Sequence, residues 1–466
     1  MLQAGAAARE RALDDAVALG ADGVRALVPW HEIAPAPRSG QPPAGFDPAD
    51  PSAYAPERWD RLDALVRGTA ARGLSLLLSP STPAPAWASR CEGSETRRRL
   101  CPDGAQYGAF LRALGRRYSG SRIDENEGGR VLPRVTRWSF SNEPNQPSWL
   151  RPQFARAGGL RYPAAAVTYR GMVLAGIDGL RASGHGRDQM LLGETSPIGR
   201  VRGRLATRPV PPAAFIRALL CIDREGAALT GRAAAARDCE RPRRLRVSGF
   251  AHHPYNRGGS KPPLTKGPAA TEITIASAGR LARLLDAAAR LRRIPRGLPI
   301  HYTEFGFQTN PPDLVFGLPP ARQAEYVNQS DWIAYRNPRV RTVAQYKLVD
   351  DAVVSSFQSG LRFWDGRRKP GYDAYRLPLW ITRKGSSRLR VYGQLRPLAP
   401  GASATVQLQN AALGAGPFRT VKRIAVSSQN NTFLAAIRRR EGRFRLRWIA
   451  PDGSVLLSRE AVAAPR

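Results

Sequence analysis

The feature of this 466-residue chain that most constrains its fold is a regular alternation of helix-like and strand-like segments. Seven short apolar runs have the character of buried strands, and each follows a segment whose apolar residues recur at helical spacing. The predicted strands are 23–30, 74–78, 135–141, 189–194, 245–252, 299–303 and 341–348. Because strands that alternate with crossover helices form parallel sheets, the pattern predicts an α/β protein.

The number of predicted strands points to a particular closed architecture. Seven strands, each preceded by a helix, are one short of a (β/α)8 TIM barrel, whose own first strand would precede the helix at 9–19. We therefore expect such a barrel over residues 1–378, with its first strand missing from the N-terminus of this sequence. Seven strands would also fit an open parallel sheet, which is the alternative to a barrel.

The composition changes after about residue 378. Short alternating runs at 389–392, 405–408, 421–426, 433–437 and 444–448 are separated by Gly and Pro. Regularly spaced short strands with such turns are typical of antiparallel sheets. We expect residues 379–466 to form a small β-sandwich, an accessory domain beside the barrel.

Two glutamates directly follow predicted strands: Glu143 comes after 135–141 and Glu304 after 299–303. In a parallel barrel the reacting groups lie where the strands end. Hydrolysis of a glycosidic bond through a covalent intermediate needs a proton-donating carboxyl and an attacking carboxylate about 5–5.5 Å apart. A single strand-end glutamate is usually only a solvated or salt-bridged carboxylate, but two at such positions make a candidate catalytic pair.

The sequence around these glutamates resembles a known superfamily. Asn142-Glu143-Pro144 at the end of the predicted fourth barrel strand, and Thr303-Glu304-Phe305-Gly306 at the end of the seventh, are similar to the acid/base and nucleophile motifs of the clan A retaining glycoside hydrolases. The resemblance covers about residues 9–380. It implies that Glu143 is the general acid/base and Glu304 the nucleophile.

The same resemblance implies roles for further polar residues. Asn142 would bind the sugar 2-hydroxyl, and His253-Pro254-Tyr255 matches a His-x-Tyr motif whose Tyr contacts the nucleophile. Arg25 corresponds to an arginine near the nucleophile. We expect a Glu143 pKa that burial and the Glu304 charge raise, and an ionised Glu304 held by Tyr255 and Arg25.

Aromatic side chains in the loops after strands commonly stack on the flat C–H faces of sugar rings. The candidates here are Trp30, Trp87, Trp149 and Trp364. The resemblance places a Trp at the end of the eighth strand as the floor of the first sugar site, but this chain has Tyr346 in that region. Either Tyr346 or Trp364 from the following loop is expected to take that place.

Four cysteines fall into two close pairs in loop-like segments. Cys91 and Cys101 lie ten residues apart, and Cys221 and Cys239 lie eighteen apart. Four cysteines allow three connectivities, of which two local disulfides fit these spacings. Disulfides predict an extracellular or cell-surface protein, although this start lacks a secretory signal. One upstream segment would supply both a signal and the missing strand.

The formal net charge of +35 comes from 72 basic and 37 acidic residues, and all but 6 of the basic residues are Arg. Abundant Ala, Gly, Pro and Arg with scarce Lys is typical of a GC-rich coding bias. The Arg-rich stretches 97–99 and 438–440 lack interleaved aromatics, so we expect solvated faces and no specific nucleic-acid site. A secreted cation could still adhere to acidic cell-surface polymers.

Together these patterns predict a retaining glycoside hydrolase that cleaves β-glycosidic bonds of a polysaccharide or oligosaccharide. No metal-ligand spacing, phosphate loop or dinucleotide motif occurs, so no metal and no cofactor are expected. No run approaches the roughly 18 apolar residues of a membrane span. The alternatives are a catalytically inactive carbohydrate-binding or scaffold protein on the same barrel, and a nucleic-acid binder with salt-dependent affinity.

Overall fold

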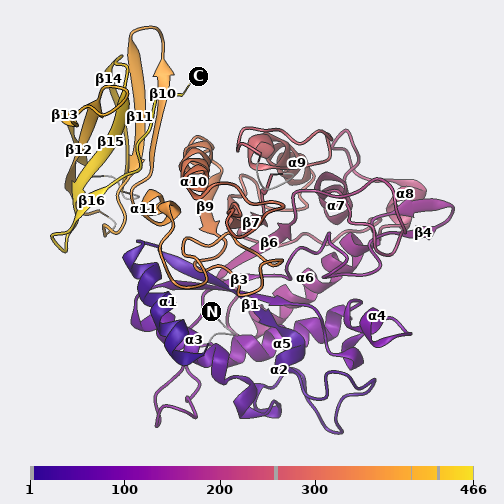
Figure 1. The fold of residues 1–466 in the computed structure, drawn as a ribbon. Coiled ribbons are helices and arrows are strands. Elements are labelled where there is room, and N and C mark those ends of the chain that lie inside the picture. Colours follow the sequence, from indigo (N-terminus) through magenta and orange to yellow (C-terminus); the bar gives the residue numbers. More distant parts are fainter. Residues whose placement is uncertain (1–4, 257–260, 400, 428–430, 465–466) are drawn as a thin grey trace.

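A computed structural model describes residues 5–256, 261–399, 401–427 and 431–464 (Figure 1). Its helices are α1 Ala6–Ala18, α2 Trp30–Ile33, α3 Asp60–Ala71, α4 Glu95–Arg99, α5 Gly104–Arg117, α6 Ala164–Ala182, α7 Pro212–Leu219, α8 Gly231–Ala235, α9 Ala278–Arg290, α10 Pro320–Tyr335 and α11 Pro370–Arg376. The helix expected before each parallel strand is present.

Seven parallel strands form one sheet in the order β1-β2-β3-β6-β7-β8-β9. They are β1 Gly23–Pro29, β2 Ser75–Ser81, β3 Arg137–Ser139, β6 Gln189–Thr195, β7 Gly249–His252, β8 Ile300–Phe305 and β9 Val340–Gln345. All seven predicted strands are found, each within a few residues of its expected bounds. A short hairpin, β4 Ala155–Ala157 with β5 Leu160–Tyr162, lies in the β3–α6 connection and was not predicted.

The parallel sheet is strongly curled. Four strands separate β1 from β8, so a flat sheet would hold them about 24 Å apart at the usual strand spacing. Yet Nη1 of Arg25 on β1 lies 3.2 Å from Oε2 of Glu304 on β8. This contact requires the sheet to bend back toward itself, which brings the carboxyl ends of its strands around a common centre.

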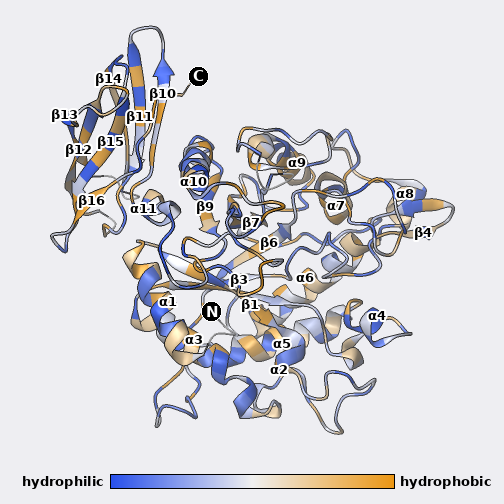
Figure 2. Cartoon of the chain, viewed as in Figure 1, coloured by the Kyte–Doolittle hydropathy of each residue, from blue (hydrophilic) through white to orange (hydrophobic). Residues whose placement is uncertain are grey.

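Amphipathic helices surround the sheet (Figure 2). In α9, Leu281, Leu285 and Ala288 are buried at the spacing of one helix face, while Arg283 and Arg290 are exposed on the other. Such a stripe stabilises the helix mainly through the apolar area that it buries against the core. One large hydrophobic cluster extends through the sheet and these helices.

The C-terminal part of the chain forms two antiparallel sheets, ordered β10-β11-β14 and β13-β12-β15-β16. Their strands are β10 Leu379–Lys384, β11 Arg388–Gln394, β12 Ala404–Ala411, β13 Arg419–Val426, β14 Thr432–Arg438, β15 Arg443–Ile449 and β16 Val455–Leu457. Both sheets contribute to a second hydrophobic cluster. Five of these strands, β11 to β15, were predicted. Strand β10 was missed because its buried Leu-Trp-Ile run does not alternate, and the three-residue β16 was missed as well.

Helix α10 connects the two parts of the molecule. Trp332 on α10 forms a small aromatic cluster with Trp380 of β10 and Tyr392 of β11. The side chain of Asn328, also on α10, accepts a 3.2 Å hydrogen bond from the backbone N–H of Leu379. The first C-terminal strand is therefore fixed to the helical layer by both apolar and polar contacts.

Both predicted disulfides are present, Cys91–Cys101 and Cys221–Cys239. Each closes a short loop, which limits the freedom of the unfolded chain. Among the helices of the described residues, none combines the length and apolar character that crossing a membrane requires.

Candidate active site

The segment after β3 carries Asn142 and Glu143 and is held in an unusual backbone shape. Ser141 and Glu143 have φ values of 54° and 35°, which non-glycine residues rarely adopt. Asn145 fixes this segment, because its Oδ1 accepts a 2.8 Å hydrogen bond from the Ser196 N–H after β6. Backbone strain of about 1–3 kcal/mol per residue persists only where the surroundings enforce it, and it concentrates at functional sites.

Glu143, His253 and Glu304 meet at the carboxyl ends of β3, β7 and β8. Nδ1 of His253 lies 3.0 Å from Oε1 of Glu143 and 3.8 Å from Oε2 of Glu304. One carboxylate oxygen of Glu143 and one of Glu304 lie within 4.8 Å of each other. The His253 side chain is fully buried, whereas 20% of the Glu143 side chain is exposed, so Glu143 is the more open to a ligand.

Glu304 is held from two further sides. The hydroxyl of Tyr255 donates a 2.9 Å hydrogen bond to Oε1, and Nη1 of Arg25 lies 3.2 Å from Oε2. Arg25 also donates to Oδ1 of Asn142 through Nη2, at 2.6 Å. The geometry thus brings together the six polar side chains that the sequence singled out, namely Arg25, Asn142, Glu143, His253, Tyr255 and Glu304.

A third carboxylate, Glu194 of β6, lies beside Arg25, and its side chain is fully buried. It accepts hydrogen bonds from Nε of Arg25 at 2.9 Å, from Oγ of Ser79 at 2.8 Å and from Oγ of Ser139 at 2.9 Å. Its position results from a break in the β6 register, where Gly193 has φ 114° and an added Cβ would meet Ala251. Glu194 therefore orients Arg25, which in turn contacts Glu304.

Sequence reasoning left the role of Glu194 open and did not identify Ser79 or Ser139. Ser139 and Ser141 alternate along the predicted strand 135–141, one face of which turns inward, whereas Ser79 lies outside the predicted strand 74–78 and carried no such signal. Small hydroxyl residues on an inward face imply a buried polar partner.

The ionisation of these groups follows from their surroundings. Burial raises the pKa of Glu143, and the Glu304 charge adds to the rise, while the hydrogen bond with His253 opposes it. Burial lowers the pKa of His253, but the charges of Glu304 and Glu143 outweigh burial and raise this pKa above its ordinary value. Burial raises the pKa of Glu194, but the Arg25 guanidinium outweighs burial and holds this pKa below its usual value. Glu143 is thus biased toward the protonated form and Glu194 toward the ionised one.

The aromatic candidates lie in different environments. Trp30 is fully buried, stacked on Phe110 at a centroid distance of 5.4 Å, so its position gives no support to a sugar contact. Trp87 is nearly buried and donates from Nε1 to the Pro35 carbonyl at 2.9 Å. Trp149 is half-buried in the loop after β3, and Trp364 is 65% exposed in the loop after β9. Of the four, Trp149 and Trp364 offer ring surface to a ligand.

Tyr346 follows β9 and lies near the site. Its backbone N–H donates a 2.7 Å hydrogen bond to the carbonyl of Phe305, the residue after Glu304. Burial raises the pKa of the Tyr346 hydroxyl, and the charge of Glu304 raises it further. Its ring packs edge-on against Phe357 at 5.2 Å. This placement is compatible with the expected floor of a sugar site.

The three groups Glu143, His253 and Glu304 also have the donor types of a metal site. Two features make them a poor cation cage. The Arg25 guanidinium already contacts Glu304, and Nδ1 of His253 is already engaged with Glu143. The arrangement fits proton transfer and carboxylate chemistry better than metal binding.

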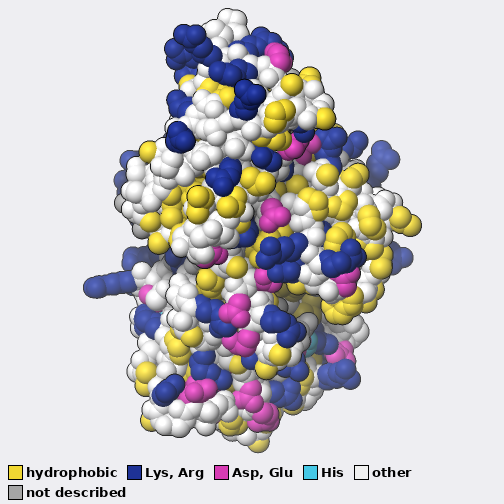
Figure 3. All heavy atoms as spheres, turned by 60° about the vertical axis from the view of Figure 1, so that its left-hand side comes forward, with side chains coloured by type: hydrophobic (Ala, Val, Ile, Leu, Met, Phe, Trp, Pro, Cys, Tyr) yellow, Lys and Arg dark blue, Asp and Glu magenta, His cyan; other side chains and the backbone are white. Residues whose placement is uncertain are grey.

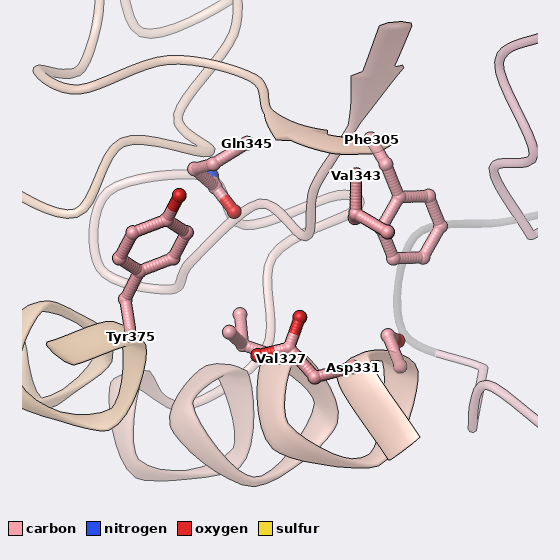
Figure 4. Close-up of a pocket in the computed structure, with 7 residues that line it drawn as sticks. Phe305, Val327, Asp331, Val343, Gln345 and Tyr375 are labelled. Atoms are coloured by element: carbon pink, nitrogen blue, oxygen red, sulfur yellow. The ribbon is translucent and has the colours of Figure 1, made fainter. Parts of the chain in front are cut away.

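A small cavity lies between helices α10 and α11 and strands β8 and β9 (Figure 4). It is lined by Phe305, Val327, Ser330, Asp331, Val343, Gln345 and Tyr375. Burial raises the pKa of Asp331, whose Oδ2 lies 3.6 Å from Nη1 of Arg396. None of the six site residues lines this cavity, so it is separate from the carboxylate pair.

Comparison with known proteins places these observations beside solved structures. No family model and no curated protein sequence matches this chain. Solved structures similar to it include GH5_18 from Streptomyces cattleya in complex with GlcNAc, at 17% identity and a TM-score of 0.47, covering 80% of this chain and 74% of that one. A family 1 β-glucosidase from Thermotoga maritima is 13% identical with a TM-score of 0.46, covering 77% and 81%. A β-glucosidase from Exiguobacterium marinum is 15% identical with a TM-score of 0.46, covering 78% and 84%. Likeness at this level decides neither activity nor substrate, so the function rests on the geometry of the site.

Proposed function

We propose that this protein is a retaining glycoside hydrolase that cleaves β-glycosidic bonds of a polysaccharide or oligosaccharide. The observation that carries the proposal is the approach of Glu143 and Glu304 to within 4.8 Å between oxygens. That distance fits the close pair of a double displacement, about 5–5.5 Å between carboxyl groups, better than the wider separation of an inverting enzyme.

In the first step, protonated Glu143 gives its proton to the glycosidic oxygen while the Glu304 carboxylate attacks the anomeric carbon. The bond from that carbon to the leaving oxygen breaks, an alcohol departs, and a glycosyl ester of Glu304 forms. The raised pKa of Glu143 supports its role as the acid. Tyr255 and Arg25 orient Glu304 and stabilise its negative charge before the attack and again once the ester is hydrolysed.

In the second step, Glu143, now ionised, takes a proton from water as the water oxygen attacks the same anomeric carbon. The ester bond breaks, the sugar leaves with its original configuration, and Glu304 returns as a carboxylate. His253 assists both steps by keeping its 3.0 Å contact to Glu143 while the charge of Glu143 changes. Asn142, fixed by Arg25, is placed to bind a hydroxyl of the sugar.

We assign this chemistry to residues 1–378 and treat 379–466 as an accessory β-sandwich domain. The separation of the two hydrophobic clusters supports that division. Two disulfides support an extracellular or cell-surface location, because such bonds persist in oxidising compartments.

The proposal is tested by hydrolysis of aryl β-glycosides and of soluble β-glucans, xylans and galactans, with the oxidised protein and its Glu304→Gln variant. Turnover of one class of substrate by the native protein, and its loss in the variant, is the expected result. A folded native protein that hydrolyses none of them would favour an inactive carbohydrate-binding role instead.

A further inference from the structure

The four-stranded C-terminal sheet has one face that the proposed hydrolysis does not use. Along β12, β13 and β15, alternate residues turn inward into the hydrophobic cluster, namely Val406, Leu408, Ile424, Phe444, Leu446 and Trp448. The intervening residues belong to the opposite face: Gln407, Gln409, Arg423, Arg443, Arg445 and Arg447. Arg423 is exposed, Gln409 is buried beside Arg445, and the other four are partly exposed. We call these six residues the arginine face.

The strand register fixes the spacing of this face. Gln407 of the central strand β12 pairs with Arg423 on one side and with Arg447 on the other, and Gln409 pairs with Arg445. At the usual strand spacing the backbones of Arg423 and Arg447 are about 10 Å apart, and those of Arg445 and Arg447 about 7 Å apart. The face is therefore a repeated array of cations with amides between them.

Most of this charge has no partner of opposite sign. Arg443 pairs with Glu460 at 2.7 Å, and Arg445 donates to Gln409 at 2.8 Å while its guanidinium lies over Phe418. Within the described ranges, neither Arg423 nor Arg447 has a hydrogen bond or ion pair from its side chain. Guanidinium groups left unpaired on a folded surface remain available to an external anion.

The surroundings of the arginine face strengthen its positive potential. In the sequence from 379 to 466, sixteen residues are Lys or Arg and only three are acidic, Glu441, Asp452 and Glu460. Figure 3 shows Lys and Arg side chains gathered at the upper end of the molecule, where the C-terminal sheets lie, with little Asp or Glu among them. An anionic polymer would be attracted to this end of the protein from solution.

We propose that the arginine face binds an acidic polysaccharide, a polymer whose sugar rings carry carboxylates. The guanidinium forks of Arg423 and Arg447 can each donate two parallel hydrogen bonds to a carboxylate, and the amide N–H groups of the partly exposed Gln407 between them can donate to a sugar hydroxyl. Protein sites for single-stranded nucleic acid combine cations with exposed aromatic rings on which the bases stack, and the arginine face lacks such a ring, which disfavours that ligand. On this face the nearby ring, Phe418, is covered by Arg443 and Arg445.

The test uses the full chain and polygalacturonate as the probe, with binding followed by calorimetry at low and at moderate salt. The variant R423Q/R445Q/R447Q removes three charges from the face. The matched control, R383Q/R388Q/R438Q, removes three exposed charges from the other C-terminal sheet, with the same change in net charge. Because binding needs no turnover, the result is independent of whether the barrel hydrolyses any substrate.

We expect the face variant to raise the Kd for polygalacturonate about tenfold and the control to change it by less than about twofold. Equal losses in both variants would mean attraction to net charge alone and would overturn the proposal. So would tighter binding of the native chain to duplex DNA or to anionic lipid vesicles, or no binding to polygalacturonate. The single variant R423Q, on the edge strand β13, should show a smaller loss of affinity. It tests the proposal even if the triple variant does not fold.

Discussion

Nδ1 of His253 lies 3.0 Å from Oε1 of Glu143. The imidazole is fully buried, and the structure describes no partner for its Nε2. The contact with Glu143 is thus the main polar constraint on the ring. It also couples the protonation of the two side chains, since each favours the charged form of the other.

This coupling makes the pH dependence of activity testable. In the proposed mechanism hydrolysis requires protonated Glu143, so activity should fall as the pH rises through the pKa of that group, which burial raises above its ordinary value. His253 lowers the Glu143 pKa, so His253→Gln should move the alkaline limb of kcat/KM to higher pH. The control is His301→Gln, which removes a histidine that contacts Thr342 instead of the site. A limb that moves to lower pH, or moves equally in the control, would contradict the coupling.

The proposed role of Glu143 as proton donor predicts a dependence on the leaving group. Glu143→Gln should lower kcat about 10²–10⁴-fold for glycosides whose leaving alcohol needs a proton. For a dinitrophenyl glycoside, whose phenolate leaves without one, formation of the glycosyl enzyme should be almost unaffected. The comparison is a burst measurement on both substrates with native and variant protein. Equal losses on both would assign Glu143 another role.

Glu194 is predicted to act by positioning Arg25. Glu194→Gln leaves a buried guanidinium short of a charge partner, a change that costs about 3 kcal/mol in comparable sites. We expect kcat to fall about a hundredfold with little change in KM. The control Asp286→Asn breaks the Arg339–Asp286 pair, whose Asp286 side chain is 48% exposed, and should leave kcat unchanged. A KM effect without a kcat effect in Glu194→Gln would argue for substrate contact instead.

Much of this site was predictable because it depends on local pattern. Glu143 and Glu304 directly follow apolar strands, and parallel strands bring their carboxyl ends to one edge. The partners of Glu194 were not predictable, because the meeting of Ser79, Ser139 and Glu194 depends on the curl of the sheet and on the irregular turn at Gly193.

Long-range packing also decided which aromatic rings are exposed. Trp30 directly follows β1 and was a candidate sugar platform, yet it stacks on Phe110 of α5, far along the chain. Strand β10 was missed for a related reason. Its Leu379–Ile381 run is buried against both the cluster and α10, so the two-residue alternation that marks a half-exposed strand is absent.

A buried ion pair outside the site makes a prediction about stability. Asp63 of α3 accepts hydrogen bonds from Nε of Arg117 and from the Tyr118 hydroxyl, and the side chains of Asp63 and Arg117 are fully buried. Asp63→Asn should lower the free energy of unfolding by about 3 kcal/mol, because it leaves the buried guanidinium of Arg117 with only the partly exposed Glu125, 3.0 Å away, as its anion. Asp178→Asn, in an exposed pair with Arg243, should cost less than about 1 kcal/mol. Denaturant titration of both variants checks this, and similar losses in the two would contradict it.

The central claim is that Glu304 forms a covalent bond to the sugar. The most direct measurement uses a dinitrophenyl 2-deoxy-2-fluoro-β-glycoside of the sugar that the substrate panel identifies. The fluorine slows both steps, and the reactive leaving group keeps the first one accessible, so the glycosyl ester accumulates. The account predicts a mass increase of one fluorosugar on the peptide that carries Glu304, and none in Glu304→Gln. Label on another residue, or hydrolysis by Glu304→Gln at the native rate, would contradict it.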